Sequence, residues 1–175
     1  GPTAVGKGTV VAALTKRFPT LNVSISATTR DPRPGELNGV HYYFVSTQEL
    51  DAMIERGDML EWALVHGKNK YGTPRGPVDE ALAAGKPVLL EIDLAGARQV
   101  RTTRPDAQFI FLAPPSWEEL ERRLIGRGTE SPEEQARRLA TARVELEAAS
   151  EFDHVVINDD VERAVDELAR LIGLE

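Results

Sequence analysis

The sequence predicts an α/β fold in which a parallel sheet carries helices on both faces and is interrupted by an inserted mixed or antiparallel lobe. Strand-like runs alternate with helical patterns along most of the chain, as in parallel sheets joined by crossover helices. The run over 86–93 has the continuous apolar character of a strand buried on both faces. Between 27 and 72, consecutive strand-like runs break the alternation, which predicts the inserted lobe.

In the first half of the chain, hydrophobic periodicity and capping signals define the expected elements. Pro19 ends the first helix, and Pro74 opens the last helix of this half. Ser46, with Glu49 three residues later, predicts a capping box. The expected elements are a helix at 9–18, strands at 21–25 and 40–45, a helix at 46–56, a strand at 59–65 and a helix at 74–85.

In the second half, the strand–helix alternation is regular. Ser116 predicts a capped helix that ends at Gly126, and Pro132 lies near the start of a long alanine-rich helix. The expected strands are 86–93, 108–112 and 154–157. The expected helices are 94–101, 116–126, 131–150 and 160–172.

The composition fits one soluble globular domain and argues against several kinds of partner. The chain has 175 residues, no cysteine and a formal net charge of −7. The lack of cysteine excludes disulfides and thiolate metal sites, and the acidic balance argues against a nucleic-acid polymer as partner. No apolar run reaches the length of a membrane span, so we expect no membrane partner. Arginines outnumber lysines by 16 to 5, which favours a small phosphorylated ligand because a guanidinium can bind phosphate through two parallel hydrogen bonds.

The first nine residues have the pattern of a phosphate-binding P-loop, with Gly1, Gly6 and Lys7 at the required offsets before a helical run. Small residues let backbone N–H groups point at phosphate oxygens, and the helix N-terminus and Lys7 add positive charge. Gly8 replaces the usual hydroxyl residue, so Thr9 lies one position late as a Mg²⁺ contact. A glycine-rich turn before an ordinary helix is the alternative. The sequence begins at Gly1, so the strand expected to lead into such a loop is absent from it.

Segment 26–39 is too rich in proline and glycine to form a helix. It carries Arg30 and Arg33 on either side of Asp31 and Pro32. Two guanidinium groups on a stiff loop suit a phosphate dianion. A solvated surface loop explains this spacing equally well.

Glu61 lies between Leu60 and Trp62, two large apolar residues. A carboxylate there suits the guanine edge, whose N1–H and N2 amino group are adjacent donors. Adenine lacks this donor pair and would leave a buried carboxylate unpaired, which can cost roughly 10⁴-fold in discrimination. The alternative is a solvent-facing glutamate on an amphipathic strand.

Glu91 and Asp93 are two residues apart at the carboxyl end of the expected 86–93 strand, so their side chains should share a face where α/β sheets bind ligands. They could hold Mg²⁺ through water and contact a guanine edge. Asp93 is equally suited to cap the next helix, and the two roles are compatible. Arg123 and Arg127 share a helix face, but such arginines commonly form a solvated surface paired with nearby glutamates.

In their order along the chain, the motifs resemble those of guanylate kinases over essentially the whole sequence. They are Gly-x-x-x-x-Gly-Lys-Gly-Thr (1–9), Ser-x-Thr-Thr-Arg-x-Pro-Arg-x-Gly-Glu-x-Asn-Gly (26–39) with Tyr42, Leu-Glu-Trp (60–62), Tyr-Gly-Thr (71–73), Glu-Ile-Asp (91–93), Gly-Arg-Gly-Thr (126–129) and Asn-Asp-Asp (158–160). The resemblance implies Mg²⁺-dependent transfer of the ATP γ-phosphoryl group to GMP, giving ADP and GDP for GMP recycling and purine nucleotide supply. We expect the protein to be cytoplasmic and either a monomer or a homo-oligomer.

The resemblance further implies three parts, which are a P-loop core (1–26, 73–114 and 141–175), a GMP-binding lobe (27–72) and a helical lid (115–140). Its implied ATP-binding residues are Gly1, Pro2, Thr3, Ala4, Val5, Gly6, Lys7, Gly8, Thr9 and Asn158. Its implied GMP-binding residues are Ser26, Arg30, Arg33, Tyr42, Glu61, Tyr71, Thr73, Asp93 and Arg138. Its implied catalytic residues are Lys7, Arg123, Arg127 and Arg138, and its implied Mg²⁺ contacts are Glu91 (through water) and Thr9.

Two other functions are compatible with parts of the pattern. A guanylate-kinase-like module that binds phosphorylated protein segments could use the same arginines, but Lys7 and the lid arginines favour an enzyme. A kinase for another nucleoside monophosphate is disfavoured by Glu61 and the arginine–tyrosine lobe.

Overall fold

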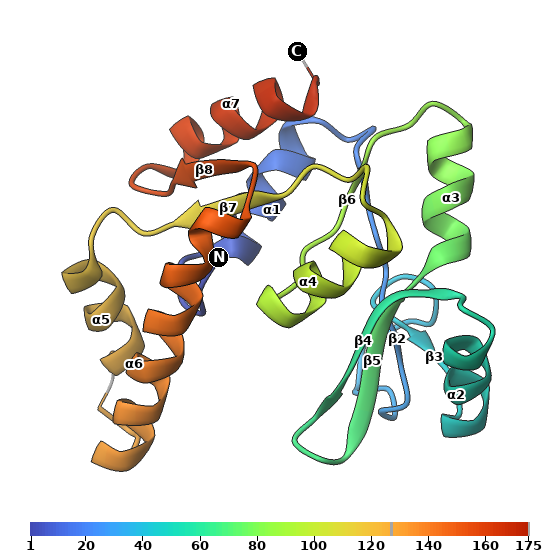
Figure 1. Ribbon diagram of the computed structural model, residues 1–175, viewed down its shortest axis with the longest axis horizontal. Helices are drawn as coiled ribbons and strands as arrows, with labels where there is room; N and C mark the ends of the chain where they lie inside the picture. The colour runs from blue at the N-terminus through green and yellow to red at the C-terminus, as the bar shows by residue number, and fades with distance from the viewer. Residues whose placement is uncertain (127, 175) are drawn as a thin grey trace. The chain divides into compact units, whose positions relative to one another are not determined.

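The computed structural model describes residues 1–126 and 128–174 (Figure 1). Contacts divide the chain into two units, one of Thr20–Ala107 and one of Gly1–Pro19 with Gln108–Glu175. Each unit contains helices and a pair of parallel strands. Within the described ranges, none of the helices has both the length and the apolar character needed to cross a membrane.

The Thr20–Ala107 unit is built around a mixed four-stranded sheet with the order β3-β2-β5-β4. In this sheet β2 runs parallel to β3 and antiparallel to β5, and β4 and β5 form a long hairpin. A separate pair joins β1 and β6 in parallel. The elements are β1 (Asn22–Val23), β2 (Ala27–Thr28), β3 (Tyr43–Phe44), α2 (Thr47–Glu55), β4 (Met59–Val65), β5 (Asn69–Pro74), α3 (Arg75–Ala83), β6 (Val88–Leu89) and α4 (Leu94–Thr103).

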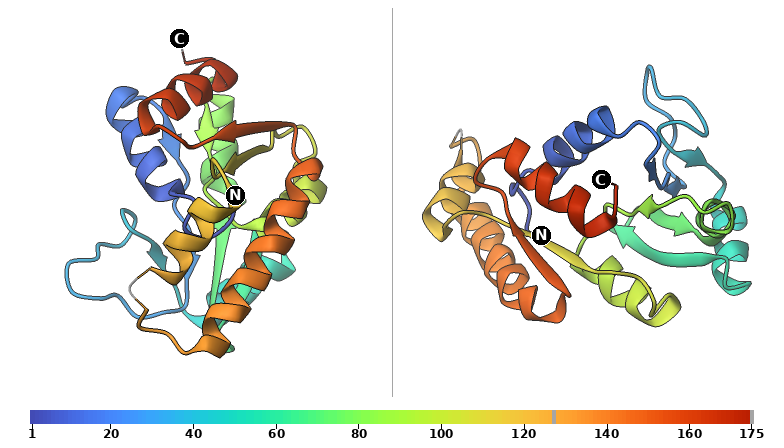
Figure 2. Two further views of the ribbon diagram at one scale, coloured as in Figure 1. Left: turned by 90° about the vertical axis from the view of Figure 1, so that its left-hand side faces the viewer. Right: turned by 90° about the horizontal axis from the view of Figure 1, so that it is seen from above.

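The second unit is built around the parallel pair β7–β8. Helices α1 and α7 pack side by side (Figure 2), where Arg17 forms ion pairs with Glu162 and Asp166. Helices α5 and α6 bury a cluster of Leu120, Leu124 and Ala142. The elements are α1 (Lys7–Arg17), β7 (Ile110–Ala113), α5 (Trp117–Ile125), α6 (Pro132–Glu147), the 3₁₀ helix Ala148–Glu151, β8 (His154–Ile157) and α7 (Val161–Ile172).

Elements with a strong local signal lie where the sequence predicts them. Ser46 Oγ accepts a hydrogen bond from Glu49 N at 3.0 Å, and Ser116 Oγ accepts one from Glu119 N at 3.1 Å. The observed β4 and β8 have the predicted bounds. The prediction of a strand over 86–93 is wrong in length, because only Val88–Leu89 pairs with β1 before the chain turns into α4.

The β4–β5 pairing contains an irregularity between Met59 and Glu61. Because of this irregularity, Met59 and Trp62 point to the same face of the sheet, where both pack in the core cluster against α2. A Cβ atom at Gly72 would lie 2.6 Å from the backbone oxygen of Glu61, so glycine is needed at this position of the hairpin. Since neighbouring strand residues point to opposite faces, Glu61 projects from the face opposite Trp62.

Candidate functional site

Two of the three glycines in the P-loop have a steric reason. Gly6 adopts φ 97° at the start of α1, and a Cβ atom there would lie 2.9 Å from Asn158 Nδ2. At Gly1 a Cβ atom would lie 2.0 Å from the carbonyl oxygen of Leu112. Gly6 provides no side-chain cap for α1. The helix N-terminus, with its partial positive charge, is therefore not neutralised by a capping side chain.

The Val5 carbonyl is held by two side chains from distant parts of the chain. It accepts a hydrogen bond from Asn158 Nδ2 at 2.8 Å and one from Arg123 Nη1 at 3.3 Å. Asn158 is 5% exposed, and its backbone N–H donates to Ala113 O at the end of β7. In a trans peptide the N–H points away from the C=O, so this anchor turns the Gly6 N–H away from Asn158. The structure thus brings to the P-loop both Asn158, expected to bind ATP, and Arg123, expected to be catalytic.

Arg30 is the centre of a polar cluster in the other unit. Its two terminal nitrogens donate to the two carboxylate oxygens of Glu36 at 2.9 and 3.0 Å, and its Nε donates to Tyr71 Oη at 3.2 Å. The guanidinium lies 5.2 Å from the ring centroid of Tyr42. The hydrogen bonds from Arg30 lower the pKa of Glu36 from its ordinary 4.5 to about 2. The cluster joins Arg30, Tyr42 and Tyr71, three of the residues expected at the GMP phosphate.

Arg33 and Ser26, also expected at GMP, contact the Arg30 cluster less directly or not at all through their side chains. The Arg33 backbone N–H donates to Glu36 Oε1 at 2.7 Å, while its side chain is exposed and makes no hydrogen bond or ion pair among the described residues. Ser26 precedes β2, and its carbonyl accepts from Tyr43 N at 2.9 Å. Glu36 was not among the predicted site residues. Its signal in the sequence is a carboxylate three residues after Arg33 in a stiff arginine-bearing loop.

Glu61, Thr73 and Asp93 converge at the start of α4. Thr73 Oγ1 donates to Glu61 Oε1 at 2.7 Å, and Asp93 caps α4 by accepting from Gly96 N at 2.8 Å. A Cβ atom at Gly96 would lie 3.2 Å from both Glu61 Oε2 and Asp93 Oδ1, so a residue without a side chain lets both carboxylates approach. Burial raises the pKa of Glu61, as does the negative charge of Asp93, while the Thr73 hydrogen bond opposes the shift.

The arginine–tyrosine cluster and the carboxylate cluster share one face of the mixed sheet. Tyr71 and Thr73 are two residues apart on β5, and Glu61 lies opposite Thr73 in the β4–β5 register. Cross-strand partners and alternate residues project from the same face. Two residues of a strand span about 7 Å, a separation that a mononucleotide can bridge between its phosphate and its base.

The predicted metal contacts are exposed. Glu91 follows β6 and Thr9 lies in the first turn of α1. The expectation that Glu91 and Asp93 project from one strand face is wrong, because both residues lie beyond the end of β6. Among the described residues, no three His, Cys, Asp or Glu side chains form a metal cluster. These donors still fit Mg²⁺, which is commonly held through one or two carboxylates, waters and substrate phosphates.

The lid arginines have different surroundings. Arg123 contacts the P-loop, as described above, and its Nε also lies 3.4 Å from Glu119. Arg138 Nη1 forms an ion pair with Glu130 at 2.7 Å. Arg127 lies outside the described residues. Arg138 belongs to a different unit from the other residues expected at GMP, so its role there stays a prediction.

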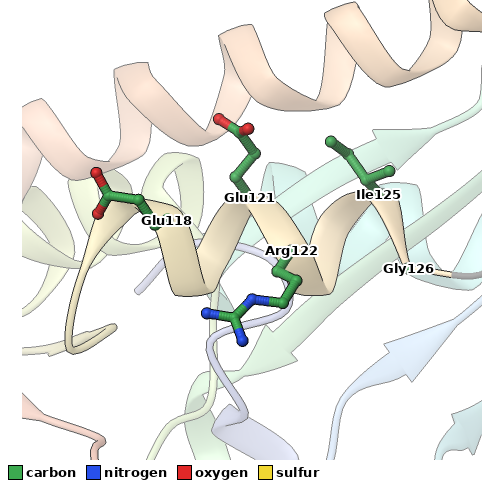
Figure 3. Close-up of a pocket in the computed structure, with 5 residues that line it drawn as sticks. All are labelled: Glu118, Glu121, Arg122, Ile125 and Gly126. Atoms are coloured by element: carbon green, nitrogen blue, oxygen red, sulfur yellow. The ribbon is translucent and has the colours of Figure 1, made fainter.

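A surface pocket of about 370 Å³ lies along α5 (Figure 3). It is lined by Glu118, Glu121, Arg122, Ile125 and Gly126. Its two carboxylates extend from one side of the helix and the guanidinium of Arg122 from another. None of these residues is an expected nucleotide contact, and the carboxylates are unsuited to a phosphate.

Comparison with known proteins gives a consistent result. The family model described as guanylate kinase matches residues 1–175. The chain is 59% identical over 174 residues to the guanylate kinase of Cutibacterium acnes, covering 99% of this chain and 87% of that protein. It is 60% identical over 174 residues to the guanylate kinase of Streptomyces coelicolor, covering 99% of this chain and 88% of that protein.

The crystal structure of guanylate kinase from Anaplasma phagocytophilum superposes with a TM-score of 0.73 at 32% sequence identity, covering 95% of this chain and 80% of that one. This similarity confirms the predicted α/β fold class. By both its sequence and its fold, the chain belongs to the guanylate kinase family.

Proposed function

We propose that this guanylate kinase transfers the γ-phosphoryl group of ATP to GMP, and that Glu61 selects the acceptor base. The observation that carries the proposal is the Glu61–Thr73 hydrogen bond of 2.7 Å beside Asp93, on the sheet face that also carries Tyr71. One face of the mixed sheet then carries both Glu61, for the base of GMP, and Tyr71, for its phosphate.

Guanine recognition follows from the state of Glu61. As a carboxylate, it accepts hydrogen bonds from guanine N1–H and the N2 amino group, with Thr73 and Asp93 completing the base site. Adenine presents no such pair of donors, so a partly buried charge would stay unpaired. A site of this kind can discriminate by roughly 10⁴-fold.

The GMP phosphate would be bound by the arginine–tyrosine cluster. Arg30 is already oriented by Glu36, Tyr42 and Tyr71. In the proposal, Arg33 and Ser26 add further donors to the phosphate, as does Arg138. Glu36 keeps the Arg30 guanidinium in place. Because the pKa of Glu36 is lowered to about 2, this carboxylate stays charged at neutral pH.

The ATP phosphates would lie in the loop formed by residues 1–9, with Asn158 near the adenine. The acceptor is already an anionic phosphate oxygen, so the reaction needs no general base. Lys7 and the arginines at 123, 127 and 138 would neutralise the charge that develops on the transferred group. Glu91, through water, and Thr9 would hold Mg²⁺, which supplies further charge neutralisation when bound.

The larger organisation is part of the same proposal. We expect the lobe of 27–72 and the lid of 115–140 to move relative to the P-loop core, and closure of the lid to exclude water from the reaction. We expect the protein to act in the cytoplasm. The protein would act as a monomer or homo-oligomer, without a nucleic-acid polymer or a membrane as partner.

A coupled ADP-release assay with GMP, AMP, UMP or no acceptor tests the proposal. We expect turnover with GMP, and activity with AMP or UMP lower by roughly 10³-fold or more. Equal rates with and without acceptor would mean that the phosphoryl group is transferred to water and would contradict transferase activity. No ADP release with any acceptor would favour an interaction module. Faster turnover with AMP or UMP would show that the acceptor base is a different one.

A further inference from the structure

The backbone of Trp62 is bonded on its outer side by a single side chain from α4. Gln99 Oε1 accepts from Trp62 N at 3.0 Å, and Gln99 Nε2 donates to Trp62 O at 2.8 Å. In the described sheet β4 is the edge strand, so no strand lies beyond it to pair with these groups. The Gln99 carboxamide therefore takes the place of the peptide group of a neighbouring strand, which it can do because it has both a donor and an acceptor.

The same helix also holds the residue on the other side of Glu61. Thr103 Oγ1 donates to the Leu60 carbonyl at 2.7 Å. Gly96, Gln99 and Thr103 are spaced by three and four residues, so they share one face of α4. At the start of that face, Gly96 lies against Glu61 Oε2. One helix thus fixes the backbone before and after Glu61 and packs against its carboxylate.

This stretch of β4 needs such support because its pairing with β5 is irregular. The register shifts between Met59 and Glu61, and at this point the hydrogen bonds between β4 and β5 constrain β4 least. A change of one residue in register turns a side chain to the opposite face of a sheet. Glu61 would then leave Thr73 and Asp93.

We propose that Gln99 is a positioning residue for base selection, holding Glu61 in the orientation that receives the guanine edge. The inference rests on the proposed role of Glu61. Gln99 does not touch the substrate. Its removal leaves the carboxylate in place but loosens its geometry, and misplacement by about 1 Å can cost on the order of 10²-fold.

The test compares Gln99→Met with Gln48→Met, an exposed glutamine on α2 in the same unit. Methionine has a similar length but cannot bond both backbone groups. For Gln99→Met we expect kcat/KM for GMP to fall about 10- to 100-fold, while the value for AMP changes less than about threefold. The KM for ATP should stay unchanged, and Gln48→Met should match the wild type.

A double-mutant cycle with Glu61→Gln separates positioning from general stability. If Gln99 acts through Glu61, adding Gln99→Met to Glu61→Gln should leave the GMP/AMP ratio of Glu61→Gln almost unchanged. A lower melting temperature with a wild-type GMP/AMP ratio in Gln99→Met would overturn the inference, since the residue would then be merely structural.

The two proposals fail in different ways. A wild-type ratio in Glu61→Gln would overturn the base-reading role itself, whereas a changed ratio in Glu61→Gln with an unchanged one in Gln99→Met overturns only the positioning role. Should Gln99→Met not fold, Thr103→Val removes the hydrogen bond to Leu60 and provides the second variant. It should shift the ratio in the same direction by a smaller factor, and a wild-type ratio there would contradict the inference.

Discussion

Glu61 has the properties of a side chain kept for a ligand rather than for stability. Burial and the nearby Asp93 both raise its pKa, while only the Thr73 hydrogen bond opposes them. A raised pKa means that the folded protein disfavours the charged form, so this group makes the free energy of unfolding fall as pH rises through the window above its ordinary pKa. Two donors from a ligand reverse that penalty, which is the physical basis for selectivity.

Asn158 shows how one residue can orient a whole loop. It is buried and its amide donates to the Val5 carbonyl, beside the weaker bond from Arg123. For Asn158→Asp we expect the free energy of unfolding to fall by about 1–3 kcal/mol, because a carboxylate oxygen replaces the donor. The KM for ATP should rise more than the KM for GMP. Urea denaturation and steady-state kinetics measure the two effects, and equal changes in both KM values would argue against a local role at the P-loop.

Among the elements, the loop between β2 and β3 depends on an ion pair. Arg30 and Glu36 are joined by two hydrogen bonds, and the pKa of Glu36 is lowered to about 2. Between pH 4.5 and about 2 the unfolded chain binds a proton at this site and the folded chain does not, so stability decreases as pH falls through this window.

Substitution of Glu36 by Gln should therefore remove part of the acid sensitivity. We expect Glu36→Gln to be less stable than the wild type at pH 7, with the difference shrinking on acidification from pH 4.5 towards 2. Urea unfolding at a series of pH values measures this, with the exposed Glu55→Gln as the matched control. A constant difference over that range would mean that the pair contributes no pH-dependent stability.

The elements also show what local sequence can and cannot reveal. The helix starts at Ser46 and Ser116 were predictable because a cap and its partner are three residues apart. The β5 strand was not predicted, since Gly72 and Pro74 weaken its local signal and its pairing with β4 defines it. Gln99 was missed because its partner, Trp62, is 37 residues away in the chain. Predicting this contact would require knowing how α4 packs along β4 in the folded chain.

Glu61 and Arg30 were predicted as site residues for the same reason. The resemblance to guanylate kinases supplied their roles, and the apolar neighbours of Glu61 or the prolines near Arg30 only made those roles plausible. The contact between Arg30 and Glu36 depends on how the loop folds back on itself, which no periodicity encodes.

At the scale of the whole molecule, the residues expected to bind ATP, the phosphoryl donor, and those expected to bind GMP, the acceptor, fall largely into separate units. The P-loop belongs to one unit, and Arg30, Glu61 and their partners belong to the other. Substitutions in one unit should therefore change mainly the kinetic parameters of its own substrate.

Lys7 provides a test of this separation. We expect Lys7→Ala to lower kcat by about 10²- to 10³-fold or more, because a charge near the transferring phosphoryl group is lost. The KM for GMP should change little. Lys16→Ala, at an exposed position of the same helix, is the matched control. Comparable losses in GMP binding and turnover for Lys7→Ala would contradict the assignment of Lys7 to the ATP phosphates.

The central claim, that Glu61 selects the base, is tested most directly by the ratio of kcat/KM for GMP to that for AMP in Glu61→Gln. Glu80→Gln, on the exposed side of α3, serves as the control. We predict that the ratio falls by at least about 10²-fold in Glu61→Gln, because the amide offers one acceptor and a misplaced donor to the guanine edge. It should stay at the wild-type value in Glu80→Gln. An unchanged ratio in both variants would show that base selection resides elsewhere in the protein.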